Sequence, residues 1–285
     1  MSASIPAVLS AVDAYAPREI AHRIETLGVT KARSDTVSVL LLAILAGAFI
    51  ALGALFFLVV VTRPIGGFGT TRLAGGVAFS LGLILVVIGG AELFTGNNLV
   101  AMAWASRRIT TAELLRNWAL VYAGNALGAL GTVGFAVLGG IHQFGDGAVG
   151  ATALAIGRHK AALGCMEAVA LGVLCNALVC LAVWLAMGGR TVTDKVLAIV
   201  FPITAFVTIG LEHSIANMFF LPYALMLQGL GDAPFIAGAL RNLVAVTLGN
   251  LVGGTVLVAG VYWCAYLRPQ RATAGAGEGR PLSAG

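Results

Sequence analysis

Long apolar stretches free of charged residues dominate the pattern of this chain. Four of them run without interruption, over residues 37–61, 117–141, 168–189 and 242–267. A helix needs about 20 apolar residues to cross the hydrocarbon core of a membrane. Each stretch is long enough and therefore predicts one membrane-spanning helix.

Two further apolar stretches stop midway at charged residues. Residues 73–91 end at Glu92, residues 196–211 end at Glu212, and in both cases an apolar segment resumes a few residues later. Each stretch predicts one span that is broken into two halves. We therefore expect an all-α membrane protein with six transmembrane helices, of which the second and fifth are discontinuous.

The two breaks share a motif, which indicates an internal repeat. The pattern G-x-E-x-x-x-small-N begins at Gly90 and again at Gly210, 120 positions later. An Arg-Asn pair followed eight residues later by Gly-Asn begins at Arg116 and again at Arg241, 125 positions later. Two matches in the same order with nearly the same offset are not expected by chance. The chain therefore contains two related halves.

These halves, residues 37–141 and 161–267, hold three spans each. Because three is odd, the second half must enter the membrane from the opposite side, which makes this an inverted repeat. Interrupted helices at matching positions of such halves indicate a permeation site near the middle of the membrane. Irregular backbone at that depth is tolerated where it is buried in protein or lines a cavity. The sequence therefore predicts a site between the two breaks.

Ionisable side chains inside a membrane are costly and are candidates for function. His213 stands at the second break, where the first break has Leu93, and an imidazole titrates near physiological pH. Thr95 is the hydroxyl best placed at the opposite break to bind it. For the paired residues of the motif we expect a structural role, in which each carboxylate holds backbone N–H groups of its own broken helix, with direct substrate contact as the alternative. These residues are Glu92, Asn97, Glu212 and Asn217.

Composition and charge agree with a membrane protein. The chain is 59% hydrophobic and 10% charged, whereas soluble domains carry about 25% charged residues. The net charge of +5 comes from basic residues scattered between apolar stretches, so nucleic acid is not an expected partner. None of the four cysteines forms a C-x-x-C pair, and we expect no disulfide, metal site or cofactor.

Lysine and arginine are distributed unequally over the alternate connecting segments. Twelve lie on the side of the two chain ends and five lie on the other side, and eight against five remain without the long N-terminal segment. Such an excess marks the cytoplasmic side of a membrane protein. We expect a multi-pass protein of the bacterial inner membrane with both ends in the cytoplasm.

The chain divides into three parts. Residues 1–36 form a cytoplasmic N-terminal segment, in which Pro17 begins and Gly28 ends a short amphipathic helix at the membrane surface. Residues 37–267 form the six-span channel domain, in contact with membrane lipid. Residues 268–285 are rich in Gly, Ala and Arg and are expected to be a disordered cytoplasmic tail.

The motifs in residues 90–97 and 210–218 closely resemble the two signatures of the formate–nitrite transporter family. The resemblance covers nearly the whole chain, from the first span to the last. It implies an aquaporin-like protomer of six spans that assembles as a homopentamer with one pore in each subunit.

The resemblance also implies roles for individual side chains. His213 resembles the central histidine of the pore, and Thr95 resembles the loop threonine that hydrogen-bonds it. Lys160 resembles a lysine just outside the fourth span that draws anions into the vestibule, and Asn176 resembles an asparagine near the outer side of the pore. Two apolar constrictions are implied beside the histidine, with ordinary helix packing as the alternative for their residues. These residues are Phe79, Leu83, Leu93, Phe94, Val179 and Phe206.

The expected function is a channel for formate or a similar small weak-acid anion. Residues 158–160, 167–172 and 219–222 look more like formate channels of the family than nitrite channels. An ion in an apolar constriction costs several kcal/mol to desolvate, whereas a neutral acid costs much less. Proton sharing with His213 would therefore link the flux to protons. In the alternative scheme His213 stays neutral and the anion itself passes.

Other substrates and another class of protein remain alternatives. Nitrite, hydrosulfide or lactate would suit the same fold, as would water or a small neutral solute. An intramembrane enzyme would use Glu92, Glu212 and His213, which could also bind a metal. The zinc-type H-E-x-x-H motif is absent from the sequence, and we do not expect an enzyme.

Overall fold

The computed structural model describes residues 13–268, and every regular element in this range is helical. In chain order these elements are α2 (Pro17–Arg33), α3 (Thr36–Val61), α4 (Phe68–Gly89), η1 (Gly96–Val100), α5 (Ala101–Ala105), α6 (Thr111–Leu138), η2 (Ile141–Gln143), α7 (Ala148–Ala162), α8 (Cys165–Gly188), α9 (Val192–Ile209), α10 (Ser214–Gln228), α11 (Ala233–Leu251), η3 (Val252–Gly260, a π-helix) and α12 (Val261–Tyr266). The expected tail, 268–285, lies outside the described residues apart from Arg268.

Six described helices are long and apolar enough to cross a membrane, which confirms the expected number of spans. They are Thr36–Val61, Phe68–Gly89, Thr111–Leu138, Cys165–Gly188, Val192–Ile209 and Ala233–Tyr266. The sixth joins α11, η3 and α12 into one rod of 34 residues. The all-α architecture predicted from the apolar stretches is therefore the observed one.

The second and fifth spans are broken where the motif predicts. α4 ends at Gly89, and the next residue, Gly90, has φ +79°. α9 ends at Ile209, and Gly210 has φ +90°. Glycine enters this left-handed region at little cost, so each helix can stop there. The chain resumes as η1 and α5 after the first break and as α10 after the second.

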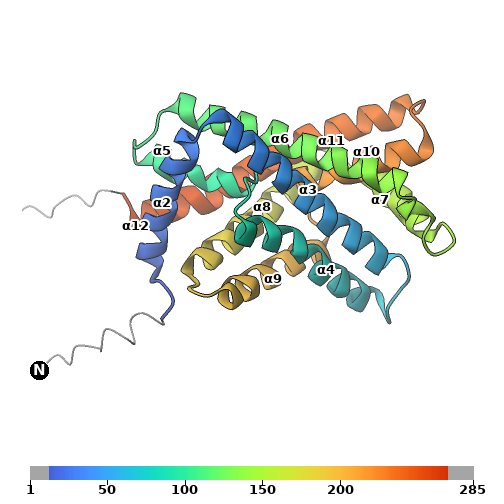
Figure 1. Ribbon diagram of the computed structural model, residues 1–285, viewed down its shortest axis with the longest axis horizontal. Helices are drawn as coiled ribbons and strands as arrows, with labels where there is room; N and C mark the ends of the chain where they lie inside the picture. Colours follow the sequence, from blue (N-terminus) through green and yellow to red (C-terminus); the bar gives the residue numbers. More distant parts are fainter. Residues whose placement is uncertain (1–12, 269–285) are drawn as a thin grey trace, which may run out of the picture.

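The two halves pack as inverted copies around the broken helices. α3 packs on α6 in the first half and α8 packs on α11 in the second, while α4 and α9 contact each other across the halves. Figure 1 shows α4 beside α9, with the start of α2 and the end of α12 at one end of the molecule and α7 at the other. The polar side chains of both breaks are buried inside this bundle.

Two helices differ from the sequence expectation. α2 does not end at Gly28 but continues to Arg33, because Gly28 serves close packing instead: a Cβ there would lie 3.1 Å from the Ala103 Cβ. The apolar face of α2, which includes the buried Ile20 and Ile24, packs against η1, α5 and α8. The apolar pattern also missed α7, whose 15 residues are too few to span a membrane.

Glycine also sets the close crossing of α3 and α6, and this gives a test of the fold. A Cβ on Gly128 would lie 1.9 Å from the carbonyl oxygen of Ile44, whereas a Cβ on Gly131 would meet nothing within 4 Å. We expect Gly128→Ala to destabilise the protein by about 1–3 kcal/mol or more, because helix backbones would have to separate. Gly131→Ala, one turn away, should change stability by about 1 kcal/mol or less. Thermal unfolding in detergent measures both, and equal melting temperatures would contradict the close crossing.

Candidate functional site

The first break holds a carboxylate between a lysine and an asparagine. Glu92 accepts from Lys31 Nζ through Oε1 at 2.8 Å and from Asn97 Nδ2 through Oε2 at 2.6 Å. Lys31 Nζ also donates to Asn97 Oδ1 at 3.0 Å, and Asn97 Nδ2 donates to Asn117 Oδ1 at 3.0 Å. The Glu92 charge, which would be costly alone in a membrane, is therefore paired and hydrogen-bonded.

The second break repeats most of this network, but no hydrogen bond among the described residues joins its lysine to the Asn217 Oδ1. Glu212 accepts from Lys160 Nζ at 2.6 Å and from Asn217 Nδ2 at 2.6 Å, and Asn217 Nδ2 donates to Asn242 Oδ1 at 2.7 Å. The side chain of Glu212 is 4% exposed and that of Lys160 is 12% exposed, against 11% and 21% for the glutamate and lysine of the first break. The second ion pair is therefore the more deeply buried one.

The backbone at each break is held by a further asparagine. Asn125 Oδ1 accepts the Phe94 N–H at 2.9 Å, and its Nδ2 donates to the Glu92 carbonyl at 2.9 Å. Asn250 does the same at the second break, at 2.8 Å to the Ser214 N–H and 3.0 Å to the carbonyl of the glutamate. An amide can both donate and accept, whereas a carboxylate only accepts. The two asparagines therefore hold the backbone at the breaks. The glutamates were expected to do this, but their carboxylates bind side chains instead.

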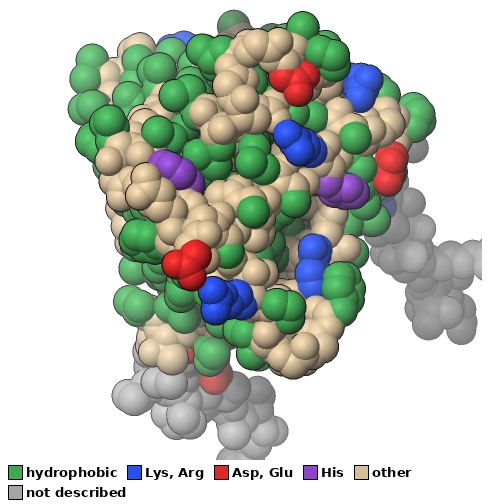
Figure 2. Space-filling model, turned by 90° about the vertical axis from the view of Figure 1, so that its right-hand side faces the viewer, with side chains coloured by type: hydrophobic (Ala, Val, Ile, Leu, Met, Phe, Trp, Pro, Cys, Tyr) green, Lys and Arg blue, Asp and Glu red, His purple; other side chains and the backbone are tan. Residues whose placement is uncertain are grey.

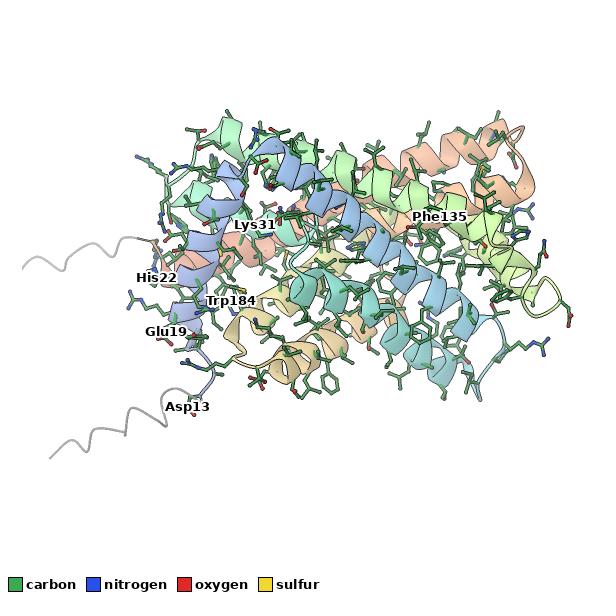
Figure 3. The ribbon with its side chains drawn as sticks, viewed as in Figure 1. Asp13, Glu19, His22, Lys31, Phe135 and Trp184 are labelled. Carbon is green, nitrogen blue, oxygen red and sulfur yellow. The ribbon has the colours of Figure 1, made fainter. Side chains whose placement is uncertain are left out.

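The two lysines come from helices that precede the expected halves of the repeat. Lys31 lies in α2 and Lys160 in α7, and their carbonyls accept from Asn117 Nδ2 at 3.1 Å and Asn242 Nδ2 at 2.9 Å. Figure 3 shows Lys31 on the side of α2 that faces the bundle, with His22 pointing away. Sequence reasoning missed the role of Lys31. The two lysines precede their glutamates by different distances, 61 and 52 positions, so spacing gave no signal.

Thr95 and His213 meet in the interior and join the two breaks. Thr95 Oγ1 lies 2.9 Å from His213 Nε2, and both side chains are buried. His213 Nδ1 accepts the Ala216 N–H at 3.1 Å and so caps the start of α10. A neutral ring that accepts through Nδ1 carries its hydrogen on Nε2. In this arrangement His213 donates to the Thr95 hydroxyl.

A cavity lies against each break. Each is lined by the lysine–glutamate pair of its break and by two of the residues expected at constrictions. In the first cavity, of about 230 Å³, these are Leu83 and Leu93. In the second, of about 320 Å³, they are Phe79 and Phe206, whose ring centroids lie 5.5 Å apart. His213 also lines the second cavity. This cavity therefore contains both the apolar phenylalanine pair and a titratable side chain.

Besides Thr95, which binds His213, three expected pore residues line neither of these cavities. The Phe94 ring packs edge-on against Tyr122 at 4.9 Å between centroids, and Val179 is 1% exposed in the core. Asn176 Nδ2 donates to Asn98 Oδ1 and to the Asn250 carbonyl, both at 2.7 Å. In this structure these three side chains are occupied by packing or by bonds between helices.

Two further residues of the second cavity were missed by the sequence analysis. Arg72 donates to the Val207 carbonyl at 2.6 Å and to the Thr208 carbonyl at 3.0 Å, at the end of α9. No carboxylate in residues 13–268 pairs with its guanidinium. His159, in the last turn of α7, also lines this cavity. Figure 2 looks onto the end of the molecule that holds α7. It shows basic side chains and histidines spread among apolar and backbone atoms.

A six-span inverted repeat with a buried polar site between two broken helices defines a membrane channel or transporter. The family described as Formate/nitrite transporter matches residues 18–264. This chain belongs to the formate/nitrite transporter family, as the resemblance of its two break motifs implied.

Individual relatives agree with this membership. The formate channel FocA of Escherichia coli (strain K12) is 40% identical over 276 residues, which cover 90% of this chain and 96% of that protein. A solved pentameric formate channel with formate bound is 40% identical, with a TM-score of 0.71 over 82% of this chain and 98% of that one. An FNT family ion channel is 29% identical, with a TM-score of 0.76 over 87% and 98%. These relatives are channels, and the protein is not an enzyme.

Proposed function

We propose that this protein is a formate channel. The observation that carries the proposal is the Thr95–His213 hydrogen bond between the two breaks, in a chain 40% identical to a formate channel. The similarity to a pentameric channel with formate bound supports formate as the substrate and a homopentamer with one pore in each subunit. The twelve-to-five distribution of lysine and arginine supports cytoplasmic chain ends in a bacterial inner membrane.

The anion is captured in the second cavity, which opens to the outside in this orientation. Arg72 and Lys160 line it together with Glu212, so its cations exceed its carboxylates by one. In the first cavity the charges of Lys31 and Glu92 cancel. Net positive charge in a concave, partly apolar site raises the local concentration of anions. Formate is therefore enriched beside His213.

His213 then shares a proton with the captured formate. Formate takes the place of Thr95 as the acceptor of the Nε2 hydrogen. A proton from the solution binds Nδ1 while Nε2 gives its proton to a formate oxygen, so the ring ends neutral and formic acid crosses. Nδ1 must release the buried Ala216 N–H, and an unsatisfied buried donor costs about 1–3 kcal/mol. This is less than the several kcal/mol needed to desolvate a bare ion.

The apolar pairs beside the two breaks act as the constrictions in this scheme. Phe79 and Phe206 stand on the side of the second cavity, and Leu83 and Leu93 stand on the side of the first. A neutral acid crosses such apolar contacts at a much lower cost than an ion. The flux is therefore linked to protons.

A second scheme keeps His213 neutral and passes the anion. The bond from the Ala216 N–H to Nδ1 favours it, because protonation of Nδ1 would place two donors face to face. The two schemes differ in whether protons accompany formate, and the pH inside a vesicle separates them.

Substrate choice is tested by flux into proteoliposomes at one fixed pH. We expect formate uptake several-fold faster than uptake of nitrite, lactate or hydrosulfide, because similarity to formate channels is the strongest evidence on the substrate. Protein-free liposomes give the background permeability of each acid. Nitrite or hydrosulfide entering faster than formate would change the proposed substrate, and background rates for all four would contradict a weak-acid channel.

A further inference from the structure

A basic hollow is lined by residues of α2, α5, α6 and α12 and shares no lining residue with either cavity of the pore. α2, α5 and α12 lie at one end of the molecule (Figure 1). The volume of the hollow is about 820 Å³, and its lining includes Arg33, Arg107 and Arg108 with one carboxylate, Glu113. Two of these arginines are paired. Arg33 Nε lies 3.0 Å from Glu113 Oε1, and Arg108 Nη1 lies 2.9 Å from Glu25 Oε2. The hollow therefore keeps positive charge that its own carboxylate does not neutralise.

Arg107 is the unpaired cation of this hollow. Its side chain is exposed and has no ion pair or side-chain hydrogen bond within the described part of the chain. Its backbone has φ +59°, a region that residues other than glycine adopt rarely and at a cost. Arg107 closes the turn after α5 by donating its N–H to the Trp104 carbonyl at 2.8 Å. A glycine would make this turn without strain. Arg107 therefore occupies a strained backbone position although its guanidinium forms no ion pair or hydrogen bond that would stabilise the described fold.

Two tryptophans frame the same hollow. Trp104 donates its indole N–H to Thr111 Oγ1 at 3.0 Å, and Trp263 donates its own to Ser106 Oγ at 2.8 Å. Both indole N–H groups are thus bound within the protein, and the rings are fixed in place. Tryptophan is enriched where a membrane protein meets the headgroup layer. The tryptophans of the hollow are therefore of the residue type that is enriched at the headgroup layer.

A shallow apolar groove begins on the other side of Trp263. It runs along η3 and α12 past Val256 and Val261, which are 59% and 55% exposed, and it reaches Arg268. Arg268 also lacks a described acidic partner. A charged hollow that continues into an exposed apolar groove has the shape and chemistry of a phospholipid: an anionic headgroup joined to acyl chains.

We propose that the hollow around Arg107 binds the phosphodiester headgroup of an anionic glycerophospholipid, whose acyl chain lies along the groove beside Trp263. Basic pockets between helices at the cytoplasmic surface are known to take such headgroups. The site is separate from the pore, so lipid bound there fixes α2, the α5–α6 turn and α12 together without entering the path of the substrate.

The test uses the full-length protein in neutral detergent and phosphatidylglycerol with brominated acyl chains, which quench tryptophan fluorescence on contact. The same measurement is made with brominated phosphatidylcholine. The test variant is Arg107→Gly, which removes the guanidinium and relieves the left-handed backbone, so the fold is not at risk. The control variant is Arg63→Ala, which removes an exposed arginine at the opposite end, 4.0 Å from Asp146.

We expect phosphatidylglycerol to quench the wild-type protein at lower concentration than phosphatidylcholine. Arg107→Gly should raise the phosphatidylglycerol concentration at half-quenching by about fivefold, the effect of one arginine near an anionic membrane surface, and Arg63→Ala should leave it unchanged. Equal quenching by both lipids, or an unchanged response of Arg107→Gly, would overturn the proposal. Release of the lipid by millimolar inorganic phosphate would also overturn it, since the site would then be one for free phosphate.

Discussion

Replacing Lys160 with alanine is expected to lower the free energy of unfolding by about 3–5 kcal/mol. The change removes the ammonium that lies 2.6 Å from Glu212, whose side chain is 4% exposed. Loss of one partner of a buried ion pair leaves the other charge uncompensated in a medium that solvates it poorly. Thermal unfolding of the purified protein in detergent measures the effect.

The inverted repeat provides matched controls for this variant. Lys31→Ala removes the partner of Glu92 in the same way. The side chains of Lys31 and Glu92 are more exposed, at 21% and 11%, so this variant should lose less stability than Lys160→Ala. The double variant Lys160→Ala/Glu212→Gln removes both charges and should recover most of the stability. If Lys160→Ala unfolded at the same temperature as wild type, the ion pair would not stabilise the broken helix.

Formate uptake by the same variants separates the structural role of Lys160 from attraction of the anion. Lys160→Ala alone lowers the net charge of the second cavity from +1 to zero, whereas the double variant keeps it at +1 and should keep the fold. If Lys160 draws formate into this cavity through its net charge, uptake should fall in Lys160→Ala mainly at low salt and low formate, because a vestibule charge acts by raising local concentration, and it should recover in the double variant. Equal loss at all ionic strengths would leave Lys160 as a structural residue. Anion attraction would then fall to Arg72, which lines the same cavity.

The architecture could be predicted from the sequence because its signals are local. Six apolar stretches give six spans, and the positive-φ glycines Gly90 and Gly210 mark where two of them stop. The repeat predicted that the breaks holding Thr95 and His213 lie close together, since an inverted repeat brings matching breaks together. The family resemblance implied the hydrogen bond between the two side chains. These features could be predicted from patterns along the chain, without knowing which helices contact each other.

The features that were missed depend on contacts between distant segments. Lys31 carries no motif of its own, and its bond to Glu92 joins positions 61 apart. Arg72 was counted only as an outer charge, yet it binds carbonyls 135 and 136 positions away. α7 has neither the length of a span nor a strong apolar pattern. The packing of Phe94 on Tyr122 and the hydrogen bonds of Asn176 to neighbouring segments could not be read from the sequence either.

His213→Asn is expected to abolish the acid-dependent uptake of formate. The substitution is well matched to the site. Asparagine is a favourable residue at the start of a helix, so it can replace His213 Nδ1 in accepting the Ala216 N–H, now 3.1 Å away. Its amide can also donate toward Thr95. What it removes is the ring that can take a proton at one nitrogen and give one at the other. A passive pore for ions could remain.

The central claim is that formate shares a proton with His213, and one measurement tests it directly. Formate uptake and the internal pH of proteoliposomes are recorded together, for wild type and His213→Asn, at several external pH values. The account predicts that wild-type uptake rises as the external pH falls and acidifies the interior, and that both responses disappear in the variant. Unchanged, pH-dependent uptake by His213→Asn would contradict the account and leave His213 a packing residue.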